Sequence, residues 1–290
     1  MSWMQLSVDT SADATAQVEE LLLELGALSI TLLDRADQPL LEPAPGELPL
    51  WQQVRIQALF EADTDPAALA ANLQRRAGQE LALHWQTLPD QDWERAWMAD
   101  FQPRRLGRRL WVCPSWCPPP EPDAINLLLD PGLAFGTGTH ATTALCLEWL
   151  DSQPLEGVTV LDYGCGSGIL AIAALLLGAE TAVAVDHDPQ ALTATRANAE
   201  RNGIPPGQLT VLPPDELPAA ARFDVLVANI LAAPLIELAP RLQRHLSAGA
   251  RFALSGILAD QAEAVAAAWP AAELSLHHRD EWVRISGRWC

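Results

Sequence analysis

The sequence predicts an α/β protein in which a small α+β domain precedes a doubly wound, mostly parallel sheet of seven strands. Three observations support this fold class. The first ninety residues read as four strands and two helices, strands alternate with helices from about residue 160 onward, and only residues 279–281 separate the last two predicted strands. Alternating strands and helices favour a parallel sheet. A three-residue connection requires a terminal antiparallel hairpin.

The N-terminal domain is predicted to span residues 1–88. Pro66 suits the first turn of a helix, and Gly26 and Gly78 each follow a predicted helix and end it. The element order β-α-β-β-α-β is that of the ferredoxin-like, or split β-α-β, arrangement. The predicted strands cover residues 3–8, 27–34, 53–60 and 80–87, and the predicted helices cover residues 12–25 and 66–77.

Negative charge is concentrated in this domain. The whole chain has 37 acidic and 18 basic residues and a net charge of -19, and residues 1–90 alone hold fourteen Asp and Glu against four Arg. A surface of this sign attracts basic proteins and repels phosphate backbones, so no nucleic-acid specificity is expected. Charge alone leaves two interpretations open, a docking surface for a basic partner and a solvated acidic face.

The composition indicates the compartment in which the protein works and excludes some kinds of ligand site. No apolar run approaches the roughly 20 residues of a membrane span, and the N-terminus lacks a basic signal-peptide start, so we expect a cytoplasmic protein without membrane contact. Five cysteines favour a reducing compartment over a disulfide framework. Cys113 and Cys117 have no matching Cys or His pair nearby, so no metal site is predicted. The chain has no lysine, which excludes a Walker A phosphate loop.

Residues 89–103 are predicted to be a linker with a short helix over 92–101, and residues 104–290 form the second domain. Four arginines stand just before a predicted strand over 110–114. They either contact ribosomal RNA or neutralise acidic neighbours, and the second interpretation is favoured. The four are Arg104, Arg105, Arg108 and Arg109.

The segment 130–143 is glycine-rich and ends in residues that begin a helix. Phe135 lies where it would cover a ligand and exclude water, and Thr139 or His140 would cap the helix. Thr143 places a hydroxyl on the first turn. A capping or packing role is favoured for His140 over that of a general base.

A short apolar strand, three alternate glycines and the start of a helix make residues 160–169 the most informative run of the chain. Gly164, Gly166 and Gly168 allow the backbone to approach a ligand, and the helix after them presents unpaired N–H groups. A pyrophosphate-binding loop has the spacing G-x-G-x-x-G, and here the last glycine comes one residue early. The spacing therefore disfavours a nicotinamide or flavin cofactor.

Two carboxylates stand at the ends of neighbouring predicted strands. Asp186 follows the strand 181–185 and is placed to accept hydrogen bonds from ribose hydroxyls. Asp162 precedes the glycines, where its charge would suit a cationic ligand such as the sulfonium and amino groups of S-adenosylmethionine. The run resembles the first signature of class I S-adenosylmethionine-dependent methyltransferases. S-adenosyl-L-methionine is therefore the predicted cofactor, and Gly164, Gly166, Gly168 and Asp186 are predicted to bind it.

The remaining elements complete the predicted sheet. Because its last two strands form a hairpin, the sheet resembles that of class I methyltransferases and differs from that of dinucleotide dehydrogenases. The predicted helices cover residues 169–177, 189–202, 235–245 and 260–268, and the strands after 160–162 cover residues 181–185, 209–212, 223–230, 250–255, 273–278 and 282–287.

Asn229 ends a predicted strand at the edge where doubly wound folds bind their ligands, which makes it a candidate site residue. In methyltransferases that act on adenine or glutamine, the sequence at this position resembles Asn-Pro-Pro-Tyr or Asp-Pro-Pro-Tyr. The aromatic residue of that run stacks on a flat substrate. Ile230 and Leu231 follow here instead, and no aromatic residue comes after them. A tetrahedral amine is therefore the favoured acceptor.

Taken together, the glycine loop, Asp186, the run 229–232 and the segment 130–143 resemble the bacterial ribosomal protein L-eleven methyltransferase family over essentially the whole length. The resemblance implies that the N-terminal domain recognises the basic ribosomal protein, whose lysine and N-terminal amines become trimethylated. It also implies that S-adenosylmethionine is contacted by Thr143, Gly164, Asp186 and Asn229. Ala141 stands where the family usually has proline.

No catalytic residue is assigned from the sequence, and the chain is expected to act as a monomer. A methyltransferase of a small-molecule or nucleic-acid amine is the alternative function, and a non-catalytic binding module is a second alternative.

Overall fold

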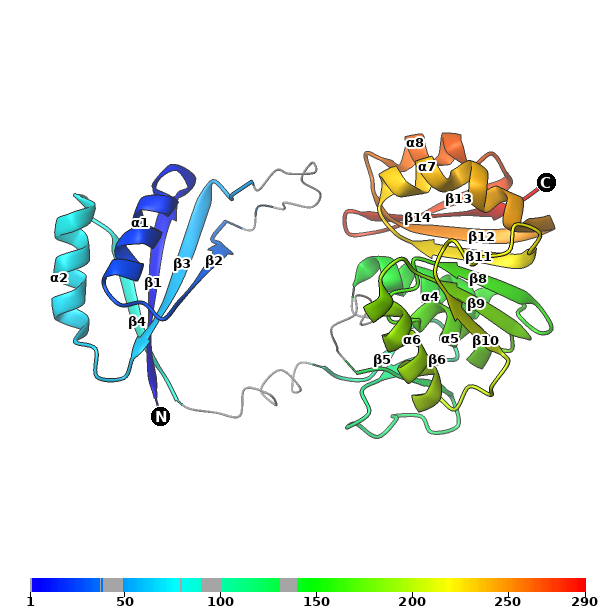
Figure 1. Ribbon diagram of the computed structural model, residues 1–290, viewed down its shortest axis with the longest axis horizontal. Coiled ribbons are helices and arrows are strands. Elements are labelled where there is room, and N and C mark those ends of the chain that lie inside the picture. The colour runs from blue at the N-terminus through cyan, green and yellow to red at the C-terminus, as the bar shows by residue number, and fades with distance from the viewer. Residues whose placement is uncertain (1, 37, 39–48, 79, 90–100, 131–139) are drawn as a thin grey trace. The chain divides into compact units, whose positions relative to one another are not determined.

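The computed structural model describes residues 2–36, 38, 49–78, 80–89, 101–130 and 140–290. The chain divides into two compact units, residues 1–97 and residues 98–290, which are labelled by element in Figure 1. Most of the predicted linker helix over 92–101 lies outside the described residues. We therefore treat each unit by itself.

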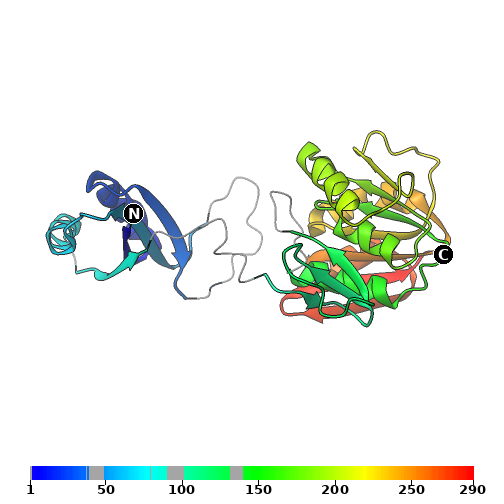
Figure 2. The same cartoon turned by 90° about the horizontal axis from the view of Figure 1, so that it is seen from below.

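The first unit contains a four-stranded antiparallel sheet in the order β2-β3-β1-β4, and both helices lie on the same side of it (Figure 2). Alternate residues of β3 are buried, as expected for a strand with one covered face. Leu22 and Leu73, one from each helix, are fully buried in one core with Leu6 and Ile56. The elements are β1 (Trp3–Ser11), α1 (Ala12–Glu24), β2 (Ser29–Asp34), β3 (Gln53–Glu61), α2 (Pro66–Ala77) and β4 (Ala82–Leu88).

The second unit is built on a sheet in the order β10-β9-β8-β11-β12-β14-β13. Neighbouring strands run parallel except that β14 is antiparallel to both β12 and β13, which confirms the predicted terminal hairpin. The strands are β8 (Thr159–Tyr163), β9 (Thr181–Val185), β10 (Leu209–Leu212), β11 (Phe223–Asn229), β12 (Leu246–Leu258), β13 (Ala272–Arg279) and β14 (Trp282–Arg288).

Helices cover both faces of this sheet, and consecutive strand residues therefore enter different cores (Figure 1). Val160 of β8 packs in the core with α4 and α5, whereas Leu161 packs in the core with α7 and α8. This burial on both faces explains why the strands read as continuous apolar runs. The helices are α4 (Ala141–Ser152), α5 (Ile169–Leu176), α6 (Pro189–Arg201), α7 (Ala232–Leu242), the 3-10 turn η2 (Gln243–His245) and α8 (Ala262–Ala268). Among the described residues, no helix has the length and apolar character needed to cross a membrane.

A small three-stranded sheet precedes α4, and two of its strands were not predicted from the sequence. It contains β5 (Arg104–Arg105), β6 (Leu110–Cys113) and β7 (Ile125–Leu128). Asn202, at the end of α6, holds β7 through its side-chain amide, which accepts from the backbone N–H of Leu128 at 2.7 Å and donates to its carbonyl at 2.8 Å. This tertiary clamp has no signal in the local sequence.

Two of the four arginines, Arg105 and Arg109, pair with acidic residues in the structure, which agrees with the favoured interpretation for these two. Asp151 is buried and accepts hydrogen bonds from the backbone N–H of Arg108 and from the backbone and side chain of Arg109. Arg105 forms an exposed ion pair with Glu121 at 3.6 Å. The cluster therefore joins the small sheet to the end of α4.

Replacing Asp151 with alanine is expected to lower the free energy of unfolding by about 3 kcal/mol, because several part-buried hydrogen bonds to one buried carboxylate are lost at once. Calorimetric unfolding of the full chain measures this loss. Glu121→Ala is the control, since an exposed ion pair contributes at most about 1 kcal/mol. Equal losses for the two variants would contradict the assigned role of Asp151.

Candidate active site

A pocket of about 560 Å³ lies where β8, β9 and β11 end, at the carboxyl edge of the parallel strands. This edge is where doubly wound folds bind ligands. Of the residues predicted to form the site, Gly164, Asp186 and Asn229 line the pocket. Thr143, Gly166 and Gly168 are not part of the lining, and each has a different place in the structure.

Gly164 begins the turn after β8 with a φ of 77°, and its N–H donates to the carbonyl of Val185 at 2.7 Å. A Cβ atom at this position would lie 2.2 Å from the side chain of Ile230. The residue must therefore lack a side chain for two reasons, its left-handed backbone and the closeness of Ile230.

Asp186 is held in place by the loop that it faces. One carboxylate oxygen accepts from the N–H of Gly166 at 2.9 Å, and the other accepts from the N–H of Asp188 at 3.0 Å. Asp186 is 8% exposed and contributes to the pocket lining. Each carboxylate oxygen has a second lone pair. Asp186 can therefore accept hydrogen bonds from ligand hydroxyls while it holds the loop.

Gly168 is the N-cap of α5 and has a φ of 78°. A Cβ atom on it would lie 2.6 Å from Thr195, whose hydroxyl donates to the carbonyl of Gly166 at 3.0 Å. Asn198 adds a hydrogen bond to the carbonyl of Ser167 at 2.8 Å. Thr195 and Asn198 support the loop from α6 and were not identified from the sequence, because their role depends on how α6 packs.

Asp162 does not line the pocket, so the interpretation that its carboxylate faces the ligand is wrong. The residue is fully buried, and one of its oxygens accepts from the N–H of Ala171 at 3.0 Å. Burial raises the pKa of Asp162 to about 7, well above that of an exposed aspartate. Asp162 is thus a structural residue beneath the glycine loop.

Asp162→Asn is expected to gain stability relative to the unsubstituted chain as pH rises from 5 to 8. The pKa of Asp162 is higher in the folded than in the unfolded chain, so its contribution is full below about pH 4 and is lost as pH rises through 7. Asparagine has no proton to lose in this range. We expect the difference in melting temperature to grow by about 3 °C between pH 5 and pH 8.

The control for this pH series is Asp188→Asn, which removes an exposed carboxylate at the N-cap of α6 and keeps a good capping residue. Differential scanning calorimetry without ligand gives the melting temperatures. If the difference in melting temperature between Asp162→Asn and the unsubstituted chain stayed constant across the series, the Asp162 carboxyl would not hold its proton more tightly in the folded than in the unfolded chain.

Thr143 and Asn229 form a pair. The amide of Asn229 donates to the hydroxyl of Thr143 at 3.2 Å, and Thr143 is fully buried on the first turn of α4. Asn229 itself is half-buried and lines the pocket. Thr143 therefore orients the side chain of Asn229 at the edge of the pocket.

His140 caps α4 and is one of the two residues predicted for this role. Its ring nitrogen accepts from the N–H of Thr142 at 3.4 Å, and its ring packs edge-on against Trp282 with 5.0 Å between centroids. Residues 131–139, which include Phe135 and Thr139, lie outside the described residues.

Several pocket residues were not identified from the sequence. Trp282 comes from the terminal hairpin and Tyr163 from the end of β8, and both are aromatic residues at strand ends. The apolar part of the lining is formed by Ile230, Leu231, Pro234 and Leu238. Tyr163 directly precedes the glycine loop, and this position is a sequence signal that would have indicated it; Trp282 has no such signal, because only the fold brings it to the pocket.

Comparison with known proteins gives consistent matches along the chain. The family model of ribosomal protein L11 methyltransferase (PrmA) matches residues 2–289. Relatives from Pseudomonas aeruginosa (strain LESB58) and Azotobacter vinelandii, both named ribosomal protein L11 methyltransferase, are 57% identical to this chain, and each match covers 99% of both chains.

A solved structure supports the same assignment. The ribosomal protein L11 methylase of Lactobacillus delbrueckii subsp. bulgaricus is 32% identical with a TM-score of 0.58, covering 66% of this chain and 100% of that chain. The resemblance predicted from the motifs is confirmed: the chain belongs to the ribosomal protein L11 methyltransferase (PrmA) family.

Proposed function

We propose that this chain transfers methyl groups from S-adenosyl-L-methionine to amines of ribosomal protein L-eleven. Asp186, fixed against the glycine loop at the carboxyl edge of the sheet, is the observation that carries the proposal. Membership in the family supports the same reaction and the same substrate.

The residues of the pocket fit such a cofactor. Asp186 would accept from the ribose hydroxyls, and the backbone of Gly164, which lines the pocket, would contact the methionine portion. Gly166 and Gly168 act indirectly, since one orients Asp186 and the other begins α5. The cofactor supplies an electrophilic methyl group on a cationic sulfur.

The pocket supports deprotonation and positioning of the acceptor without a dedicated base. A lysine amine has a pKa of about 10.4, so loss of its proton at neutral pH costs roughly 4 kcal/mol. The apolar walls formed by Leu231, Pro234 and Leu238 would exclude water once the ligands fill the pocket, and this would lower the pKa of an ammonium group held beside another cation. Water can then take the proton.

In this proposal Asn229 orients the amine. Its side-chain nitrogen is bound to Thr143, so its amide oxygen can accept an N–H of the acceptor and aim the lone pair at the methyl group. Positioning of this kind accounts for most of the expected rate.

We further propose that residues 1–88 form a ferredoxin-like domain that recognises the substrate. The antiparallel strand order of the first unit supports the ferredoxin-like assignment, and its excess of acidic residues suits a basic ribosomal protein. The linker, residues 89–103, would act as a hinge near residues 88–100 between this domain and residues 104–290, so that lysine and N-terminal amines reach the same pocket in turn and become trimethylated. We expect the protein to act as a cytoplasmic monomer.

The test uses methyl-labelled S-adenosylmethionine with purified ribosomal protein L-eleven, transfer RNA and small amines as separate acceptors. Label on the ribosomal protein alone supports the proposal, and label on RNA or small amines supports the alternative acceptors. Cofactor binding without transfer to any acceptor would indicate a binding module. Intact-mass analysis of ribosomal proteins from cells that lack this chain identifies the acceptor and counts its missing methyl groups.

A further inference from the structure

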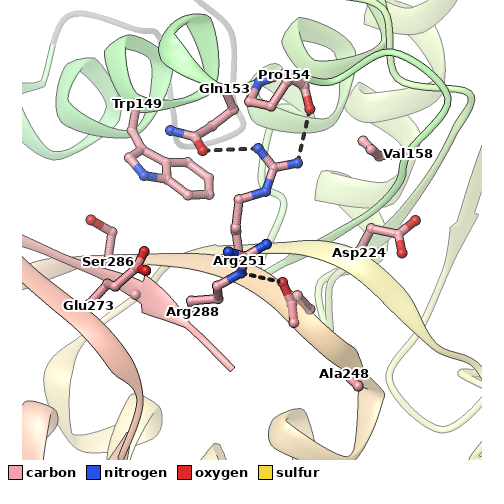
Figure 3. Close-up of a pocket in the computed structure, with 13 residues that line it drawn as sticks. Trp149, Gln153, Pro154, Val158, Asp224, Ala248, Arg251, Glu273, Ser286 and Arg288 are labelled. Atoms are coloured by element: carbon pink, nitrogen blue, oxygen red, sulfur yellow. Dashed lines mark hydrogen bonds between the residues drawn. The ribbon is translucent and has the colours of Figure 1, made fainter. Parts of the chain in front are cut away.

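A second pocket, of about 500 Å³, opens at the opposite edge of the large sheet (Figure 3). Val158 and Asp224 line it where β8 and β11 begin, whereas the candidate active site lies where those strands end. The pocket is therefore separate from the site proposed for methyl transfer. Its volume is in the range of small-molecule sites.

Two arginines stand directly opposite each other in this pocket. Arg251 of β12 pairs with Arg288 of β14 in the antiparallel register, so both side chains leave the same face of the sheet. Like charges at directly opposed positions are destabilising. Burial and the charge of Arg288 together lower the pKa of Arg251, as expected for neighbouring cations.

Neither guanidinium group forms an ion pair with a carboxylate within 4.0 Å in the described part of the chain, and the charge of Asp224 acts on Arg251 only from a greater distance. Every ion pair found there within 4.0 Å involves other residues, although the chain has 37 acidic residues to offer. Asp224 also lines the pocket, but its carboxylate is bound to Thr159, accepting from both the N–H and the hydroxyl at 2.9 Å. Glu273 lines the exposed rim.

The two guanidinium groups are oriented by neutral oxygens, as the dashed lines in Figure 3 show. Arg251 donates to the side chain of Gln153 at 3.0 Å and to the carbonyl of Pro154 at 2.9 Å, and Arg288 donates to the carbonyl of Gly249 at 3.2 Å. Each guanidinium has five N–H donors. Most of these donors remain for a ligand. The neutral oxygens fix the orientation of the two guanidinium groups without cancelling the positive charge.

We propose that this pocket binds a small organic oxyanion, a phosphate or carboxylate compound, with its anionic group between Arg251 and Arg288. An oxyanion accepts paired hydrogen bonds from guanidinium groups and removes the repulsion between them. Hydroxyl or amino groups on the same ligand would donate to Asp224 and Glu273.

The test compares melting temperatures of the full chain in inorganic phosphate, in acetate and in chloride at one ionic strength. The variants are Arg288→Gln and, as a control with the same change of charge, Arg244→Gln, an exposed residue outside the pocket. We expect at least one oxyanion to raise the melting temperature of the unsubstituted chain by about 3 °C over chloride. Arg288→Gln should lose this rise, and Arg244→Gln should keep it.

The two oxyanions distinguish the source of the anionic group, since a rise in phosphate alone indicates a phosphate compound and a rise in acetate alone indicates a carboxylate. In chloride, Arg288→Gln should melt no lower than the unsubstituted chain, because it removes a like-charge pair. Phosphate also stabilises proteins through general exclusion, an effect that all variants share. Equal responses in all three proteins, loss of the response in Arg244→Gln, or no response in the unsubstituted chain would each overturn the proposal.

Discussion

Asp186→Ala is expected to weaken binding of S-adenosylmethionine at least 100-fold and to reduce methyl transfer to background. The alanine variant loses the acceptor for the ribose hydroxyls, and the N–H groups of Gly166 and Asp188 lose the carboxylate that orients them. Loss of charge-assisted hydrogen bonds of this kind costs about 3 kcal/mol, which is roughly 100-fold in affinity. Titration calorimetry with the cofactor measures the affinity.

Asp188→Ala is the matched control, because it removes the neighbouring carboxylate from the N-cap of α6 without removing a pocket residue. Loss of the cap should cost about 1 kcal/mol of stability and leave the affinity nearly unchanged. If Asp186→Ala bound the cofactor as tightly as the control, the assignment of Asp186 would be wrong.

Gly256→Ala is expected to be the most destabilising of the single substitutions considered, with a loss of about 4 kcal/mol. Gly256 has a φ of 83°, and a Cβ atom on it would lie 2.4 Å from the carbonyl oxygen of Ile230. That contact is with backbone, so it cannot be relieved by rotation of a side chain. The substitution combines backbone strain with overpacking.

The control is Gly249→Ala in the same strand. Gly249 has a φ of 76°, but the nearest atom to a Cβ there is 3.9 Å away, so only the conformational cost of about 1 kcal/mol applies. Calorimetric unfolding of both variants separates strain from contact. Similar losses for the two would mean that the backbone at Ile230 can move away from residue 256, and that the close contact there is not rigid.

Local patterns in the sequence were sufficient to predict most strands of the large sheet and part of the candidate site. The strand, glycine loop and helix around Gly164 have a spacing that few backbones satisfy, and the structure places Asp186 and Asn229 at the edge of the sheet where parallel strands end. The hairpin followed from three residues between two strands. In the glycine loop the glycines made the prediction possible, whereas in β12 they made it less accurate. Gly249 and Gly256 interrupt the apolar pattern there, so the predicted strand was shorter than the observed one.

The sequence by itself determined most of the helices and strands of the two units, where the glycine loop turns and which family the chain resembles, because those properties depend on neighbours a few residues apart. Only the tertiary structure decided that Asp162 is buried beneath the loop, that Thr143 binds Asn229, and that Trp282 enters the pocket. It also decided that Arg251 stands opposite Arg288. These contacts join residues far apart in the chain, and the register and packing of the folded strands alone bring them together.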